Sequence, residues 1–116
     1  MNCSVVNNIL TTSTFEHDLK RLAKRYKSLF EDLAEFKKEL IENPEIGADL
    51  GKGLRKVRLA IKSKHRGKSG GGRIITYTVL VTDDAVNILL VTMYDKSEES
   101  SKTLREIRQI ISTYLD

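Results

Sequence analysis

The sequence predicts an α+β fold, in which a single sheet is combined with a pair of helices. Apolar residues recur at helical spacing over residues 13–42, and they alternate or run together at strand spacing over residues 57–94. The order of these segments reads β-α-α-β-β-β-α along the chain. Because strands joined by short links pair side by side, we expect an antiparallel sheet. The helix pair should pack on one face, and a basic cleft should lie on the other.

The N-terminal half supplies the first strand and both helices of the pair. Val5–Thr11 is a short, partly alternating run that is typical of a strand. Ser13 and Ser28 are each followed by glutamate at the third position, a capping-box spacing that predicts two helix starts. Asn43-Pro44 ends the second helix, because the residue before proline avoids helical backbone angles. We expect residues 43–53 to form a loop.

The C-terminal half supplies three strands and the last helix. Residues 57–61 alternate apolar and polar side chains, which predicts a half-buried strand. Residues 73–81 are rich in β-branched side chains, and residues 86–94 are almost continuously apolar, as expected of a central strand. Asp83-Asp84 marks the turn between them. Ser97, followed by two glutamates, is the predicted N-cap of the last helix.

Length and composition predict one cytoplasmic domain. The chain has 116 residues, of which 40% are hydrophobic and 6% aromatic, enough for one modest core over residues 1–116. Its one cysteine, Cys3, cannot form an internal disulfide, which favours a reducing compartment. Residues 1–14 lack the pattern of a signal peptide, and no run is long enough to span a membrane. We therefore expect no membrane association.

Charge is concentrated in one part of the chain. Between Leu50 and Thr82 there are nine Lys and Arg residues and no Asp or Glu, whereas the rest of the chain holds 11 basic and 16 acidic residues. Such a single-sign block predicts a site for a polyanion. The basic residues of the block are Lys52, Arg55, Lys56, Arg58, Lys62, Lys64, Arg66, Lys68 and Arg73.

Three common kinds of site are poorly supported. Gly67-Lys68-Ser69 resembles the end of a phosphate-binding P-loop, but Lys62 stands where that motif requires glycine, and a strand is predicted to follow. His17 and His65 are not in ligand-spaced clusters, so we expect no metal. No nucleophile-elbow signature supports a Ser-His-Asp triad. We expect no cofactor.

Three segments together point to a known family. They are Leu-Arg-Lys-Val-Arg at 54–58, the Gly-Lys to Gly-Gly-Arg run at 67–73, and Tyr-Asp-Lys-Ser-Glu at 94–98. With them, the chain resembles the RelE/ParE superfamily of bacterial toxins, specifically the HigB-like ribosome-dependent mRNA interferases. The resemblance implies a RelE-like fold and metal-independent cleavage of mRNA in the ribosomal A site, in which the RNA 2′-hydroxyl attacks the adjacent phosphate. It also implies a cognate antitoxin as partner.

The resemblance assigns roles to three residues. Arg73 matches the arginine that contacts the scissile phosphate, where cations stabilise the developing charge; alternatively it is a surface arginine at a strand start. Tyr94 matches an aromatic that could stack on a base or assist proton transfer, or it is a core tyrosine. Lys96 could protonate or neutralise the leaving oxygen, or it is simply exposed to solvent.

Further basic residues are expected to bind RNA. Lys56 and Arg58 should line the cleft floor on the face of the strand opposite the core, with Lys62 in line. His65 titrates near neutrality and could act as a general acid or base. The remaining side chains expected to grip RNA phosphates, unless they are only solvated loop charges, are Lys62, Lys64, Arg66 and Lys68.

Two other functions stay open at this point. A ParE-like toxin would share the architecture but inhibit gyrase, and the dense basic segment speaks against it. A non-catalytic RNA-binding module would bind RNA with strong salt dependence and leave it intact. An antitoxin with an acidic, partly disordered segment is expected to cover the basic cleft, by charge complementarity.

Overall fold

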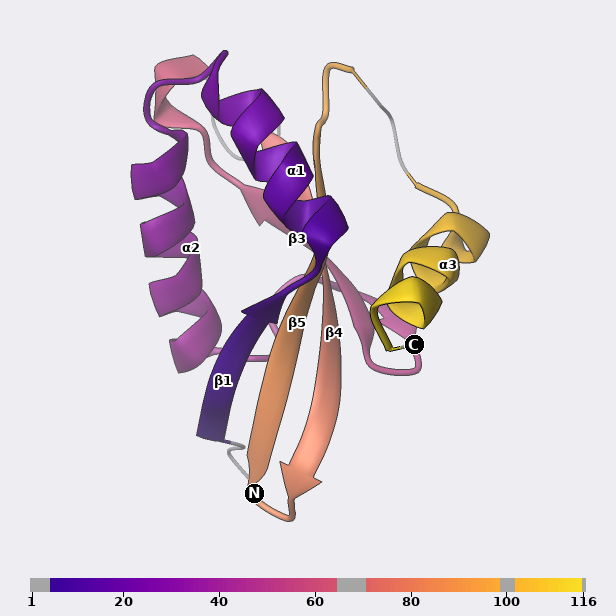
Figure 1. The fold of residues 1–116 in the computed structure, drawn as a ribbon. Helices are drawn as coiled ribbons and strands as arrows, with labels where there is room; N and C mark the ends of the chain where they lie inside the picture. Colours follow the sequence, from indigo (N-terminus) through magenta and orange to yellow (C-terminus); the bar gives the residue numbers. More distant parts are fainter. Residues whose placement is uncertain (1–4, 65–70, 99–101, 116) are drawn as a thin grey trace.

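The computed structural model describes residues 5–64, 71–98 and 102–115, and these form one sheet with helices on both faces (Figure 1). No helix of these ranges is long and apolar enough to cross a membrane. In chain order the elements are β1 (Val5–Thr11), α1 (Ser13–Ala23), α2 (Leu29–Glu42), β2 (Ala48–Gly51), β3 (Leu54–Leu59), the 3₁₀ turn η1 (Lys62–Lys64), β4 (Gly72–Thr82), β5 (Ala85–Asp95) and α3 (Leu104–Leu115).

The five strands form one mixed sheet in the order β1-β5-β4-β3-β2. Strands β3 to β5 pair antiparallel, as predicted, since short links join them, and β2 also pairs antiparallel with β3. The prediction is wrong for β1, which pairs parallel with β5. The chain leaves β1 through the helix pair and returns to β5 only after three other strands, so no hairpin constrains the direction of that pairing.

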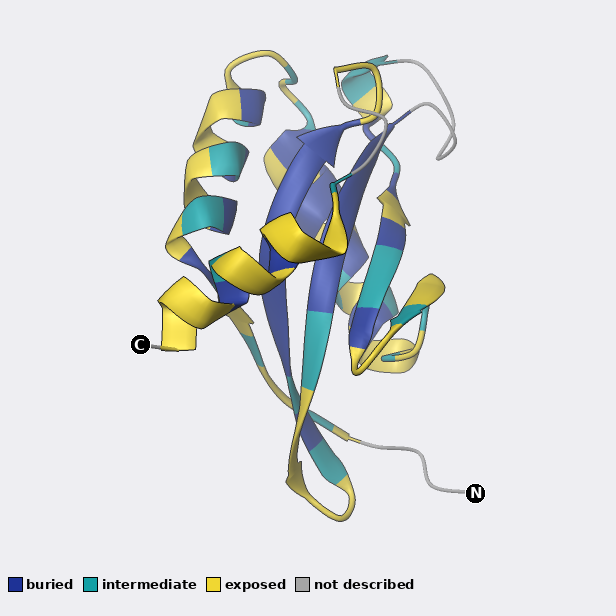
Figure 2. Cartoon of the chain, turned by 90° about the vertical axis from the view of Figure 1, so that its right-hand side faces the viewer, coloured by how far each residue is buried: buried dark blue, intermediate teal, exposed yellow. Residues whose placement is uncertain are grey.

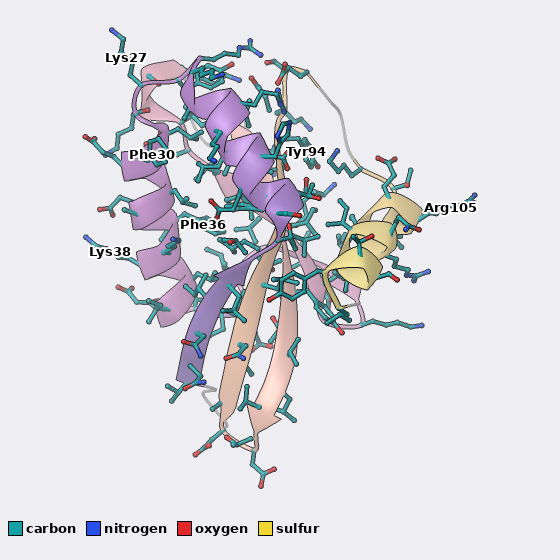
Figure 3. The ribbon with its side chains drawn as sticks, in the orientation of Figure 1. Lys27, Phe30, Phe36, Lys38, Tyr94 and Arg105 are labelled. Atoms are coloured by element: carbon teal, nitrogen blue, oxygen red, sulfur yellow. The ribbon has the colours of Figure 1, made fainter. Side chains whose placement is uncertain are left out.

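Helices α1 and α2 cover one face of the sheet, which we call the helix-pair face. Their buried side chains, such as Phe15, Leu22 and Phe36, pack with Ile74 and Leu90 from the central strands. This is the larger apolar cluster of the molecule. Figure 3 shows Phe36 directed from α2 toward the sheet, whereas Lys27 and Lys38 extend into solvent. The predicted placement of the helix pair is confirmed.

The opposite face, called the α3 face, is only partly basic. The amphipathic helix α3 lies across it and buries Ile107 and Ile111 against a second apolar cluster (Figures 1 and 2). The strand residues of this cluster are Leu54, Ile75, Leu89, Val91 and Tyr94. The expectation that this whole face is left to basic residues is therefore wrong, because alternate residues of the same strands carry a second apolar stripe.

The predicted helix boundaries hold for the helix pair. The N-cap of α1 is Thr12, one residue before the predicted Ser13, since the Thr12 hydroxyl oxygen accepts a hydrogen bond from the Phe15 amide at 2.9 Å. Helix α2 begins directly after Ser28, whose hydroxyl donates to Asp32 at 2.6 Å instead of capping the backbone. It ends at Asn43, before proline, as predicted.

Two predictions about connections are wrong. Residues 43–53 are not only a loop, because Ala48–Gly51 forms β2. This strand forms a hairpin with β3 through a turn in which Gly51, Lys52 and Gly53 have positive φ. Ser97 does not cap the last helix. Instead Thr103 does so, and its hydroxyl accepts a hydrogen bond from the Glu106 amide at 3.1 Å.

Candidate functional site

Strand register gathers basic side chains at one end of the α3 face. Arg58 of β3 is directly opposite Arg73 of β4, and Arg73 is opposite Tyr94 of β5. Side chains alternate between faces along a strand, so Lys56 shares the face of Arg58. One end of the α3 face is thus apolar and covered by α3, and the other end carries cations.

These cations line a pocket of about 500 Å³, which we call the cationic pocket. It brings together Lys56 and Arg58 from β3, Arg73 from β4, and Lys96 from the segment after β5. Its other lining residues are Ile46, Gly47, Ala48 and Val57. The lining residues that the structure describes include no Asp or Glu, so the pocket wall carries a net positive charge. An anionic group would be attracted here, and most strongly at low ionic strength.

The four cations differ in exposure. Arg73 is 7% exposed, and its Nη1 donates to the carbonyl oxygen of Gly72 at 2.9 Å. Lys96 and Arg58 are exposed, and Lys56 is half-buried. A buried guanidinium beside more exposed cations suits a phosphate, since the planar fork can bind two oxygens in a fixed geometry.

The rim of the cationic pocket is braced from the opposite face of β3. Arg55 donates through Nη1 to the carbonyl oxygens of Glu45 at 2.8 Å and Gly47 at 3.3 Å. Gly47 has φ of +95°, and a Cβ atom there would lie 2.5 Å from the carbonyl oxygen of Lys56. Only glycine therefore allows this segment to pass so close to β3.

A glycine also determines how the chain approaches Arg73. A Cβ atom on Gly71 would lie 2.1 Å from the carbonyl oxygen of Leu59, so the backbone packs against the end of β3. The Gly71 carbonyl oxygen accepts a hydrogen bond from the Lys96 amide at 3.1 Å. The approach to Arg73 and the segment that carries Lys96 are thus joined through the backbone.

Tyr94 is a core residue. Its side chain belongs to the apolar cluster under α3 and is only 1% exposed, and Figure 3 shows it inside the molecule. A base cannot stack on a ring that has no open face, so the stacking role is wrong for this structure. The alternative of a core tyrosine is confirmed, while assistance to proton transfer stays a prediction.

Lys64 is not available to RNA in this structure. Its side chain is 7% exposed, and its Nζ donates to Asp95 Oδ1 at 2.7 Å. The predicted RNA contact by Lys64 is therefore wrong, because the lysine neutralises a carboxylate whose side chain is fully buried. Lys64 also lies 5.4 Å from the centre of the Tyr26 ring.

Asp95 is the centre of this arrangement, which we call the Asp95 cluster. Besides Lys64, the Tyr26 hydroxyl donates to Oδ2, and the Ser97 amide and hydroxyl donate to Oδ1 at 2.9 and 2.7 Å. Arg25 Nη1 lies 4.0 Å from Oδ2. The cluster therefore ties the end of β5 to η1 and to the segment between α1 and α2.

The cluster shifts two pKa values. Burial alone would raise the pKa of Asp95, but hydrogen bonds from Lys64, Tyr26 and Ser97 outweigh it and hold this pKa well below its usual range. The hydrogen bond to Asp95, followed by burial, raises the pKa of Tyr26. Asp95 is consequently a carboxylate and Tyr26 a neutral phenol at neutral pH.

The remaining predicted RNA-binding residues are not placed in the pocket. Lys62 is exposed in η1, where its amide donates to Asp32 Oδ2 at 3.2 Å, and it does not line the cationic pocket. It is not in line with Lys56 and Arg58, because the chain leaves the strand after Leu59. His65, Arg66 and Lys68 lie outside the described residues.

Four of the residues predicted for the site line one pocket, but the Asp95 cluster was not predicted. The signal for it was a single acidic residue between Tyr94 and Lys96, at the end of a strand. Its partners Tyr26 and Lys64 are distant in the chain, and no local pattern connects them. A comparison with protein-family models finds no match.

Proposed function

We propose that the chain is the toxin of a type II toxin-antitoxin system and cleaves mRNA in the ribosomal A site. The observation that carries the proposal is the cationic pocket, where Arg58, Arg73, Lys56 and Lys96 converge on one concave surface. Cations fixed on adjacent strands fit the charge that builds up on a phosphodiester in the transition state. The three motifs that resemble HigB-like interferases contain all four of these residues.

The proposed reaction needs no metal. The RNA 2′-oxygen forms a bond to the adjacent phosphorus, the bond from phosphorus to the 5′-oxygen breaks, and the products are a 2′,3′-cyclic phosphate and a 5′-hydroxyl. Arg73 and Arg58 stabilise the charge on the non-bridging oxygens, and the Lys96 ammonium donates a proton to the leaving oxygen. The proton of the 2′-hydroxyl goes to a base, for which His65 stays the predicted candidate.

Partners follow from the same charge distribution. The ribosome and mRNA present phosphates to the pocket, and four cations without a carboxylate in the described lining favour association with them. The cognate antitoxin would neutralise the pocket with an acidic segment.

A non-catalytic RNA-binding module is the second candidate. It is favoured by one observation: the described lining of the cationic pocket contains no His, Asp, Glu or Tyr that could serve as a general base. Cations alone are sufficient for binding, whereas cleavage also requires a route for the 2′-hydroxyl proton.

Cleavage with purified ribosomes and a defined transcript tests the proposal. Primer extension should show cuts with the wild type, and Arg73→Ala should slow cleavage by about 10²- to 10³-fold, as expected for a lost transition-state donor. Arg58→Ala is a second variant, since Arg58 is exposed and its loss should change stability little. Arg105→Ala removes an exposed arginine of α3 outside the pocket and should cleave like the wild type (Figure 3).

Binding to single-stranded RNA distinguishes the second candidate. Loss of one phosphate contact should reduce the slope of log affinity against log salt by about 0.7, so Lys56→Ala and Lys96→Ala should each do so. Salt-dependent binding with these changes but no cuts, with or without ribosomes, would favour the binding module. An unchanged slope in both variants would contradict a role of the cationic pocket in RNA binding.

A further inference from the structure

The Asp95 cluster lies directly behind the cationic pocket. Tyr94 faces the α3 side of the sheet, Asp95 turns to the helix-pair side, and Lys96 lines the pocket. This alternation places a fully buried carboxylate between two residues of the site face. The carboxylate is too deep to contact a ligand in the pocket, so any effect on the site must pass through Lys96 or Arg73.

The backbone after β5 is tied to the residue before β4. The chain turns at Lys96–Glu98, and the Lys96 amide donates a hydrogen bond to the carbonyl oxygen of Gly71 at 3.1 Å. Asp95 adds a short turn by accepting from the Ser97 amide, and it is fixed in turn by Lys64 and Tyr26. The carboxylate therefore determines where the chain leaves the sheet, and with it the origin of the Lys96 side chain.

Burying the charged groups of the Asp95 cluster has an energetic cost. A buried ion pair is often no more stabilising than apolar residues of similar volume, because both charges lose their hydration. Here one carboxylate receives hydrogen bonds from a lysine, a tyrosine and a serine that belong to three separate segments. Such a set of directional contacts fixes geometry more strictly than an apolar contact would.

We infer that Asp95 is a positioning residue for the cationic pocket, which it orients through Lys96 while Lys64 and Tyr26 hold its carboxylate. The expected effect on cleavage rests on the proposed function, whereas the expected effect on the backbone at Lys96 does not. Arg73, Arg58 and Lys56 stay in place without Asp95, since strand pairing fixes them. Loss of Asp95 should thus affect the transition state more than substrate binding.

The test compares Asp95→Asn with a matched control, Asp18→Asn. Asp18 also binds the end of β5 from the helix-pair side, where its Oδ2 accepts from the Met93 amide at 3.0 Å and the Thr92 hydroxyl at 2.7 Å. It does not line the pocket. Both variants remove one carboxylate charge that is hydrogen-bonded at the end of β5. An effect seen only in Asp95→Asn is therefore specific to the carboxylate next to Lys96, and an effect seen in both is not.

Amide hydrogen exchange supplies a readout that needs no RNA. Asp95→Asn should speed exchange of the Lys96 and Ser97 amides by about tenfold or more relative to the wild type, while Asp18→Asn does so only around Met93. In cleavage with ribosomes, Asp95→Asn should lower kcat by about tenfold or more and leave KM within about twofold. Asp18→Asn should leave both constants close to wild type.

The outcomes separate the two claims. Equal exchange of the Lys96 amide in Asp95→Asn and the wild type overturns the inference, and so does a fall in kcat that Asp18→Asn matches. If the Lys96 amide responds but the wild type cuts no RNA, positioning stands and the proposed interferase activity fails. If circular dichroism shows Asp95→Asn unfolded, Tyr26→Phe replaces it, since it removes a single hydrogen bond to Asp95 and should shift the same amides less.

Discussion

On the helix-pair face of the sheet, Lys64 neutralises the buried Asp95 carboxylate, whereas on the α3 face four cations share an open pocket. Lys64 and Lys96 illustrate the difference. Lys64 is 7% exposed and paired with Asp95 at 2.7 Å, while Lys96 is exposed and lines the cationic pocket. Lys64 belongs to the basic block between Leu50 and Thr82, whereas Lys96 lies between Asp95 and Glu98 in an acidic segment. The comparison teaches that the surface a lysine reaches, and not the charge of its segment, decides whether it stabilises the fold or is available to a ligand.

The largest expected effect is on the apolar interior of the helix-pair face. Phe15 is fully buried there, so Phe15→Ala should lower the free energy of unfolding by about 3–5 kcal/mol, because it leaves a cavity in the main core. Urea denaturation measures this change. Phe30→Ala is the matched control, since Phe30 is 61% exposed on α2 and should change stability by less than about 0.5 kcal/mol. Similar losses in both variants would contradict the assignment of the core.

The second prediction compares two lysines of η1. Lys64→Met removes the lysine that pairs with the buried Asp95 carboxylate, and it should lower the free energy of unfolding by about 3 kcal/mol. This value is at the lower end for a broken buried pair, because Tyr26 and Ser97 still donate to Asp95. Lys62→Met, at an exposed position of the same turn, should change it by less than about 0.5 kcal/mol. Thermal unfolding of both variants decides the matter. An equal effect would show that Lys64 is not a structural cation.

The third prediction concerns acid. The pKa of Asp95 is lower in the folded chain than in the unfolded one, so its contribution is complete above the unfolded value of about 4 and is lost as pH falls toward the folded value. The free energy of unfolding of the wild type should therefore fall more steeply below about pH 4 than that of Asp95→Asn. Urea denaturation between pH 5 and pH 2, as a rough working range, at constant ionic strength compares them. Parallel curves would contradict a carboxylate held in its charged form.

The smallest expected effect is on the pocket side. Lys56→Met and Lys96→Met remove a charge that the described pocket wall does not neutralise, so stability should change by less than about 0.5 kcal/mol and can rise as repulsion is relieved. Any gain should shrink as salt is added, because salt screens exposed charges. A loss near that of Lys64→Met would erase the difference between the two faces. Thermal unfolding at low and high salt measures both effects.

Local pattern was sufficient for most elements of the fold. Helix α2 ended at Asn43-Pro44, and strands β4 and β5 extended one residue beyond each predicted boundary, because proline geometry and β-branched runs act over a few residues. The N-cap at Thr103 was missed, although Glu106 stands three residues after it at the capping-box spacing. Ser97 has glutamates directly after it but lacks that spacing, and its side chain donates to Asp95 instead.

Local pattern was likewise sufficient for only part of the candidate site. Alternation along β3 was enough to place Lys56 and Arg58 on one face, and the position of Arg73 at a strand start placed it nearby. Local pattern could not show that α3 would cover Tyr94, or that the Lys64 side chain would point inward. Burial depends on which distant segment packs on top, and α3 and Tyr26 are both far from these residues along the chain.

Most helix and strand segments and the concentration of positive charge between Leu50 and Thr82 follow from periodicity and composition, which are local properties of the sequence. Three features depend on the folded arrangement: the parallel pairing of β1, the packing of α3 on part of the α3 face, and the division of the cations between a buried cluster and an open pocket. These outcomes depend on contacts between segments that are distant along the chain, and such contacts form only when the whole core closes.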